Sequence, residues 1–107
     1  MTHHPPWKRT ETAIAKILDG QRVPVSGRGR GDQPDIAHPR LSLEVKHRRT
    51  LPAWLLDAMA QAMAASRDGR IPVAVLHPHG GRHDGDLCVM RLSDLADLLG
   101  HQQDVAP

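Results

Sequence analysis

The chain has 107 residues, of which 39% are hydrophobic, with no Phe or Tyr and a formal net charge of +2. This length supports one hydrophobic core but not two, so we expect a single domain over residues 1–107, with loose ends at 1–6 and 101–107. The sequence has no apolar run of the roughly 18 residues that a membrane span needs, and no apolar secretory stretch near its start. One cysteine, Cys88, excludes an internal disulfide and predicts a reducing, cytoplasmic setting.

The charge is distributed unevenly along the chain. Residues 1–49 contain ten Lys and Arg against five Asp and Glu, whereas residues 50–107 contain four against seven. A basic half predicts an anionic partner, and nucleic acid is the commonest one. The alternative is a solvated basic surface that has no partner.

In chain order, the apolar periodicity predicts a helix over 8–18, strands over 22–25, 36–37 and 41–46, a helix over 52–67, strands over 71–76 and 87–90, and a helix over 93–99. Gly20, Gly69 and Gly100 stand where the three helices are expected to end, and Thr50 is a candidate cap for the second helix. The order α-β-β-β-α-β-β-α predicts a mixed α/β fold, with helices packed on a central sheet of about five strands. The nearly continuous apolar run over 71–76 favours a buried position in that sheet.

The strand over 41–46 alternates strictly, so its side chains face two opposite sides. Its core-facing residues are Leu41, Leu43 and Val45, and its other face has Ser42, Glu44 and Lys46. A turn over 38–40 is expected to fold Asp35 back beside Glu44. Two close carboxylates repel each other unless a cation lies between them, and a hard divalent ion such as Mg²⁺ meets that need. The alternative is an ordinary exposed Glu44–Lys46 pair beside a turn aspartate.

A loop rich in glycine and arginine, Ser26–Asp32, precedes this hairpin. Glycine allows close approach to a phosphate backbone, and arginine contacts phosphate, so Arg28 and Arg30 are candidate DNA-binding residues. Arg48 and Arg49 form a second basic cluster of the same kind. Without a partner, the loop is simply a flexible surface segment.

Glu11 has an unusual position in the first helix. It shares one helical stripe with apolar residues, namely Trp7, Ile14 and Leu18. A carboxylate on an apolar stripe costs free energy unless a cation or donor meets it. Glu11 either lies at a partly exposed edge of the stripe or reaches the metal as a third acidic residue.

Together, Glu11, Pro34-Asp35 and Glu44-Val45-Lys46 resemble the motif of the PD-(D/E)XK nuclease superfamily. The layout is most similar to archaeal-type and phage Holliday-junction resolvases, in the order of elements over residues 8–76. The resemblance implies a restriction-endonuclease-like core and an activity on branched DNA in recombination. It also implies a homodimer, since a junction is cut on two strands.

The same resemblance assigns roles to individual residues. Asp35, Glu44 and the backbone carbonyl of Val45 would bind Mg²⁺ or Mn²⁺, and Lys46 would serve the attacking water. Glu11 would support the metal or its waters. Ser26 in the basic loop and Gln61 on the second helix are accessory candidates, with a solvent-facing side chain as the alternative for Gln61.

Two further features remain open. The histidines at 77, 79 and 83, with Asp84 or Asp86, suggest a zinc site, although no C-x-x-C motif accompanies them. We favour a loop in which these histidines contact DNA or solvent. The second helix is apolar around much of its circumference, which predicts burial against the sheet or pairing of two subunits.

The sequence supports one leading hypothesis and two alternatives. The leading hypothesis is a Mg²⁺-dependent endonuclease that hydrolyses DNA phosphodiesters at Holliday junctions or other branched DNA. The first alternative is a non-catalytic nucleic-acid-binding protein that uses its basic N-terminal half. The second is a small structural or partner-binding domain without affinity for nucleic acid.

Overall fold

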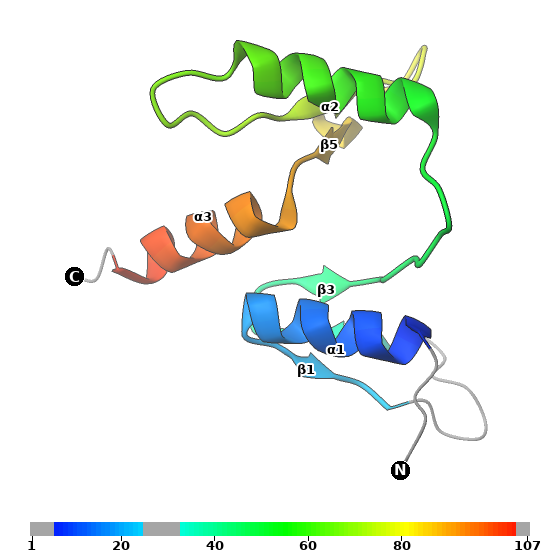
Figure 1. The fold of residues 1–107 in the computed structure, drawn as a ribbon, viewed down its shortest axis with the longest axis vertical. Coiled ribbons are helices and arrows are strands. Elements are labelled where there is room, and N and C mark those ends of the chain that lie inside the picture. Colours follow the sequence, from blue (N-terminus) through cyan, green and yellow to red (C-terminus); the bar gives the residue numbers. More distant parts are fainter. Residues whose placement is uncertain (1–5, 25–32, 105–107) are drawn as a thin grey trace. The chain divides into compact units, whose positions relative to one another are not determined.

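The computed structural model describes residues 6–24 and 33–104. In these residues the chain is a small α/β protein with three α-helices and two small antiparallel sheets (Figure 1). The predicted order α-β-β-β-α-β-β-α is confirmed, with a short 3₁₀ helix added between the last two strands. The chain divides after Arg49 into two compact units. That boundary is also where the local charge balance changes sign.

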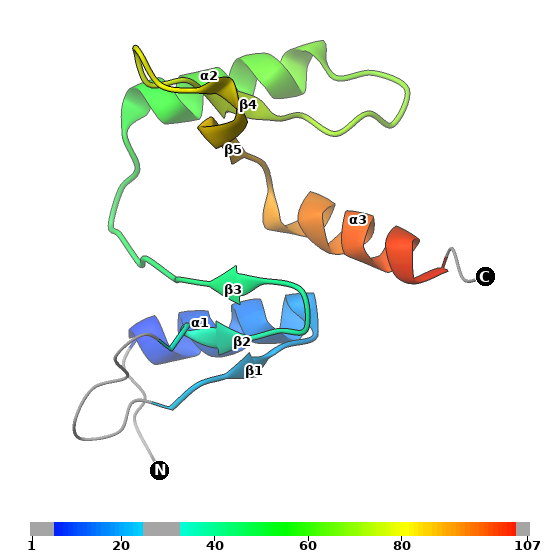
Figure 2. The ribbon, with the colours of Figure 1, turned by 180° about the vertical axis from the view of Figure 1, so that it is seen from behind.

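The first unit combines one helix with a three-stranded sheet. Its elements are α1 (Pro6–Leu18), β1 (Gln21–Arg22), β2 (Ile36–Ala37) and β3 (Ser42–Leu43). The strand order is β1-β2-β3, antiparallel throughout, with Ile36 opposite both Arg22 and Leu43. Helix α1 covers one face of this sheet: it lies in front of the strands in Figure 1 and behind them in Figure 2.

The core of the first unit lies between α1 and β2. Ala15 and Leu18 of the helix and Ile36 of the strand are buried, Ile36 completely. The helix ends where Asp19 adopts a positive φ and the N–H of Gly20 donates to the carbonyl of Ala15. Gly20 is therefore not the left-handed residue of this helix end. It is needed because a Cβ there would lie 2.8 Å from the Ala37 carbonyl oxygen.

The second unit consists of two helices and a hairpin. Its elements are α2 (Ala53–Ala65), β4 (Ala74–Leu76), the 3₁₀ helix η1 (His83–Gly85), β5 (Leu87–Val89) and α3 (Leu92–Asp104). Strands β4 and β5 pair in antiparallel register, with Leu76 opposite Leu87, and α2 packs on β4. None of the helices in the described part of the chain combines the length and the apolar character that spanning a bilayer requires.

Several predicted helix ends are wrong. Thr50 does not cap α2: the N-cap is Pro52, whose carbonyl accepts from the N–H groups of Leu55 and Leu56. The helix stops at Ala65, before the left-handed residues Asp68 and Gly69. Gly100 does not end the last helix, because α3 continues to Asp104. Residues 101–104 are thus helical and not a loose end.

The predicted central sheet of about five strands is not confirmed, since the described strands form separate sheets of three and two. The apolar run over 71–76 is also not buried on both sides. Ala74 is buried, whereas Val75 is 61% exposed, because a two-stranded hairpin covered by α2 hides only one of its faces. Helix α2 itself has no fully buried residue, and Trp54 is among its exposed apolar side chains.

Candidate active site

Asp35 is held at the centre of the first unit by its backbone and by its side chain. Its N–H donates to the carbonyl of Leu43, and its own carbonyl accepts from the N–H of Val23. The residue is only 3% exposed, and Oδ2 of its carboxylate accepts a 2.7 Å hydrogen bond from the backbone N–H of Val45. The β2–β3 hairpin thus folds Asp35 back beside the Glu44-Val45-Lys46 segment, as the turn over 38–40 predicts.

The alternation predicted for residues 41–46 is also confirmed, although only Ser42 and Leu43 are paired as β3. Ser42, Glu44 and Lys46 are exposed, and the three residues that alternate with them, Leu41, Leu43 and Val45, are half-buried. On the exposed face, Nζ of Lys46 lies 3.4 Å from Oε1 of Glu44. Both side chains remain more than half exposed, so this ion pair adds little stability. Their carboxylate and ammonium groups are therefore available to a ligand.

A cavity of about 300 Å³ brings the predicted catalytic residues together. Its lining consists of Trp7, Glu11, Asp35, Glu44, Val45, Lys46, His47 and Arg48. All four residues predicted to be catalytic, together with Val45, belong to this wall. They come from α1, from the residue before β2 and from the segment after β3, so the fold of the first unit alone assembles the cavity.

The carboxylate of Glu11 is paired with the guanidinium of Arg22. A cation is needed there because burying an unpaired carboxylate costs free energy. The Glu11 carboxylate is buried, and its Oε1 accepts a 2.9 Å hydrogen bond from Nε of Arg22. The guanidinium of Arg22 also lies 5.6 Å from the centre of the Trp7 ring. Its Nη2 is buried and makes no hydrogen bond within the described part of the chain. Helix α1 and strand β1 are thus joined by an ion pair at the cavity wall.

The structure does not gather the three carboxylates around a single point. Among the side chains of residues 6–24 and 33–100, one set of three His, Cys, Asp or Glu has ligand atoms all within 4.8 Å of one another. That set is His77, His83 and Asp86 of the second unit. Glu11, Asp35 and Glu44 share a cavity but do not meet this distance, and Glu11 already pairs with Arg22.

Two cavity features were not predicted from the sequence. His47 lines the cavity, and its Nδ1 lies 2.7 Å from Oγ1 of Thr10, whose hydroxyl also donates to the carbonyl of Pro6. This contact ties the segment after the E-x-K triplet to the first turn of α1. The role of Arg22 was also not predicted, although the position of Glu11 on an apolar stripe indicated that a buried carboxylate there would need a cation.

A second cavity, of about 420 Å³, lies along the basic side of α1. Lys8, Arg9 and Lys16 line it with Arg22, together with two uncharged residues of the helix, and no acidic residue takes part. Lys8, Thr12 and Lys16 follow one another at intervals of four, so they share one helical face. Such a groove suits a chain of phosphates.

The remaining predicted residues fall into three groups. Ser26, Arg28 and Arg30 lie outside the described residues. Arg48 and Arg49 are exposed, and Arg48 lines the same cavity as the four residues predicted to be catalytic. Gln61 is exposed on α2, in the second unit.

Comparisons of the chain with models of protein families, with curated proteins and with solved structures gave no match. What the protein does must therefore be argued from the geometry of its first unit and the chemistry of the residues gathered there.

Proposed function

We propose that the protein is a metal-dependent endonuclease that hydrolyses DNA phosphodiester bonds with Mg²⁺ or Mn²⁺. The observation that carries the proposal is the single cavity lined by Glu11, Asp35, Glu44 and Lys46. Two carboxylates and an ammonium at one sheet edge form the donor set that a hard divalent ion and a phosphate group require together. The cavity supports the proposal because it is lined by the four residues of the PD-(D/E)XK-like motif.

The two carboxylates differ in a way that suits metal binding. Asp35 is buried and fixed by the N–H of Val45, whereas Glu44 is exposed on the same segment. One rigid ligand and one adaptable ligand fit an ion that keeps several of its waters. A bound divalent ion would polarise the phosphate and lower the pKa of its water.

Lys46 would hold the water and offset negative charge. In the structure its ammonium is engaged by Glu44 at 3.4 Å, and both groups border the cavity. With Glu44 bound to a metal ion, the ammonium of Lys46 would be free to hold a nucleophilic water or to offset the charge of the phosphate. Glu11, held by Arg22, would add negative potential near the ion without leaving its ion pair.

The basic cavity along α1 would bind the DNA backbone. Arg22 lines this cavity and pairs with Glu11, which lines the catalytic one, so the Glu11–Arg22 pair contributes to both walls. Phosphate contacts from Lys8 and Lys16 would fix the register of a strand beside the carboxylates. Arg48 extends the positive surface on the catalytic side, and Arg28 and Arg30 are proposed as further contacts.

We also propose that the five strands belong to one restriction-endonuclease-like core. Strands β3 and β4 are each at the edge of their sheet, and they are connected through α2. A strand-helix-strand connection ordinarily joins two parallel strands of one sheet. Nuclear Overhauser effects between backbone protons of β3 and β4 would support this arrangement, and their absence would refute it.

Branched DNA is the proposed substrate, and a homodimer is the proposed assembly. The support is the resolvase-like order of elements and the exposed apolar face of α2, which includes Leu56 and Met63. Sedimentation at several concentrations should give the mass of two chains. A monomer at micromolar concentration would exclude the dimer.

A cleavage assay tests the proposed function. End-labelled four-way junction, linear duplex and single strand are each incubated with the protein and Mg²⁺, Mn²⁺ or EDTA. We expect Mg²⁺-dependent cleavage, strongest for the junction, which is abolished by EDTA and by Glu44→Gln. Asp57→Asn, at an exposed carboxylate of α2, is the matched control and should cut normally. Absence of cleavage of all three substrates by the wild type, or normal cleavage by Glu44→Gln, would exclude the enzyme.

One alternative is favoured by a specific observation. The basic cavity along α1 is larger than the catalytic one and includes no acidic residue, which suits a nucleic-acid-binding protein without catalytic activity. This alternative predicts salt-sensitive DNA binding that Glu44→Gln does not change, without cleavage in any metal.

A further inference from the structure

The hairpin of the second unit places a histidine and an aspartate, two residue types that can bind metal ions, opposite each other. His77 directly follows β4 and Asp86 directly precedes β5, and the last paired residues of these strands are Leu76 and Leu87. The strand register thus carries His77 and Asp86 to facing positions, where Nδ1 of His77 lies 2.6 Å from Oδ1 of Asp86. The Asp86 carboxylate is largely buried, with a side chain that is 12% exposed.

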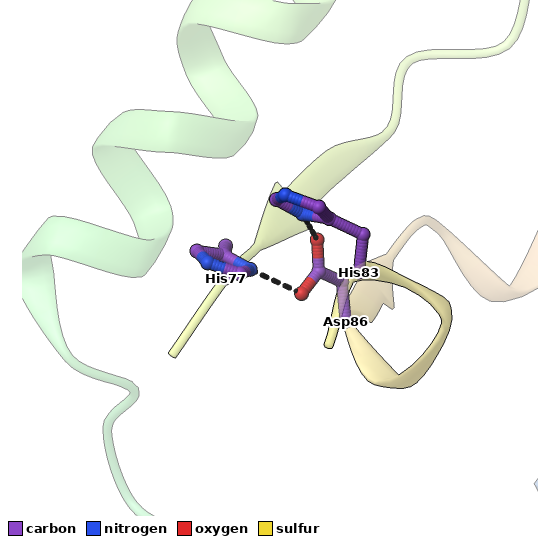
Figure 3. Close-up of side chains that lie close together, drawn as sticks. All are labelled: His77, His83 and Asp86. Carbon is purple, nitrogen blue, oxygen red and sulfur yellow. Dashed lines mark hydrogen bonds and ion pairs between the residues drawn. The ribbon is translucent and has the colours of Figure 1, made fainter. Parts of the chain in front are cut away.

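The 3₁₀ helix adds a third ligand. Residues three apart in such a helix are eclipsed, so His83 and Asp86 project on the same side of η1. Nδ1 of His83 lies 3.4 Å from Oδ2 of Asp86. As Figure 3 shows, the two imidazoles approach the two oxygens of one carboxylate, and their rings stack with centroids 4.3 Å apart.

The loop that carries these groups is shaped by local hydrogen bonds. The N–H of Gly81 donates to the Pro78 carbonyl, Gly80 adopts a positive φ, and the N–H of Asp86 donates to the His83 carbonyl. The loop's other candidate ligands face elsewhere: Asp84 pairs with Arg82, and His79 is exposed and outside the cluster. Three of the five His and Asp side chains in the segment therefore converge.

We propose that His77, His83 and Asp86 form a zinc site with an open fourth position. Two imidazole nitrogens and a carboxylate oxygen are ordinary zinc ligands, and three protein ligands with a water are a recognised set. With bonds of about 2.1 Å, two ligands of a tetrahedral zinc lie roughly 3.4 Å apart. The 3.4 Å distance from Nδ1 of His83 to Oδ2 of Asp86 already matches this value. The 2.6 Å distance from Nδ1 of His77 to the other carboxylate oxygen, Oδ1, would have to increase slightly.

The types of ligand atom distinguish this site chemically from the proposed catalytic site. Imidazole favours Zn²⁺, whereas the carboxylates of the first unit favour Mg²⁺ or Mn²⁺. The zinc would fix η1 across the ends of β4 and β5 and so stabilise the hairpin, because the unfolded chain does not present the three ligands together. The proposal does not depend on the nuclease activity.

Isothermal titration of the EDTA-treated full chain with Zn²⁺ tests the site. We expect one Zn²⁺ per chain, a rise in melting temperature with Zn²⁺, and a tetrahedral absorption spectrum when Co²⁺ is substituted. His83→Ala and Asp86→Asn should weaken binding at least tenfold and abolish the melting shift. His79→Ala and Asp84→Asn are matched controls in the same loop and should bind like the wild type.

The variants are chosen so that folding does not confuse the result. The His83 side chain is 85% exposed, so its removal should not disturb the fold, which circular dichroism without metal will verify. Asp35→Asn should keep the zinc affinity, which separates this site from the proposed nuclease. Absence of Zn²⁺ binding by the wild type, or wild-type affinity in both His83→Ala and Asp86→Asn, would leave a simple histidine–aspartate hydrogen-bond cluster and overturn the proposal.

Discussion

The backbone N–H of Val45 donates a 2.7 Å hydrogen bond to Oδ2 of Asp35 and so joins the two halves of the motif. Asp35 precedes β2, and Val45 is the middle residue of the E-x-K triplet. The bond fixes the buried carboxylate relative to the backbone that carries Glu44 and Lys46. The proposed metal ligands are therefore held by main-chain geometry as well as by side-chain packing.

Replacing Asp35 should separate its structural role from its charge. Asp35→Ala leaves the Val45 N–H without an acceptor in a partly buried position and should lower the free energy of unfolding by about 1–2 kcal/mol. Asp35→Asn retains an acceptor oxygen and should be nearly as stable as the wild type. Urea unfolding measures both. Equal stability of Asp35→Ala and the wild type would show that the bond contributes little.

The Glu11–Arg22 pair should be important for folding. Glu11→Gln removes the charge that faces a largely buried guanidinium and should cost roughly 1–3 kcal/mol of unfolding free energy. The double variant Glu11→Leu with Arg22→Met should recover most of that loss, since no charge is then left unpaired.

The exposed Glu44–Lys46 pair provides the control for that experiment. Glu44→Gln should change the unfolding free energy by less than about 0.5 kcal/mol. If Glu44→Gln destabilises the chain as much as Glu11→Gln does, the difference in burial between the two ion pairs does not determine how much each pair contributes to stability.

The double variant Glu11→Leu with Arg22→Met should remain deficient in cleavage if Glu11 also supports the metal.

Two glycines should respond to alanine with opposite signs. Gly20→Ala places a Cβ 2.8 Å from the Ala37 carbonyl oxygen and 2.9 Å from Cγ2 of Ile36, which should cost about 1–3 kcal/mol. Gly100 lies inside α3 with nothing within 4 Å of its added Cβ. Gly100→Ala should therefore stabilise the chain by about 0.5–1 kcal/mol through helix propensity. Thermal unfolding reports both changes, and a destabilised Gly100→Ala would contradict the continuation of α3 through this residue.

DNA binding should depend on the basic cavity along α1. Lys16→Ala removes one phosphate contact and should reduce the slope of log K against log salt by about 0.9 for duplex DNA. Arg70→Ala, an exposed cation of the second unit, should leave the slope unchanged. Fluorescence anisotropy at several salt concentrations measures the slopes. An equal effect of the two variants would mean that DNA binding is not localised to α1.

Local patterns predicted the order of the elements and the geometry of the E-x-K segment. The alternation predicted over 41–46 is found in the structure because each exposed residue there is polar and each half-buried residue is apolar. The separate sheets and the helix ends were not predictable in this way. Pro52 caps α2 through its carbonyl, and Gly100 is tolerated inside α3, so neither glycine nor threonine alone marks a helix end.

Long-range partners were harder to predict than local structure. Periodicity indicated that Glu11, if buried, needs a cation or a donor, but only the pairing of α1 with β1 identifies Arg22. In the same way, three histidines in a loop do not reveal which of them converge. The register of β4 with β5 and the eclipsing of η1 select His77, His83 and Asp86.

The most direct test of the central claim is the single-turnover cleavage rate of a four-way junction in Mg²⁺, compared between the wild type and Asp35→Asn. Changes that merely support metal ligands commonly cost 10- to 100-fold in activity, so loss of a direct ligand should lower the rate by about a hundredfold or more. Asp19→Asn, at an exposed residue after α1, should cleave at the wild-type rate. An Asp35→Asn protein that folds normally and cleaves as fast as the wild type would contradict a shared metal ion at Asp35 and Glu44.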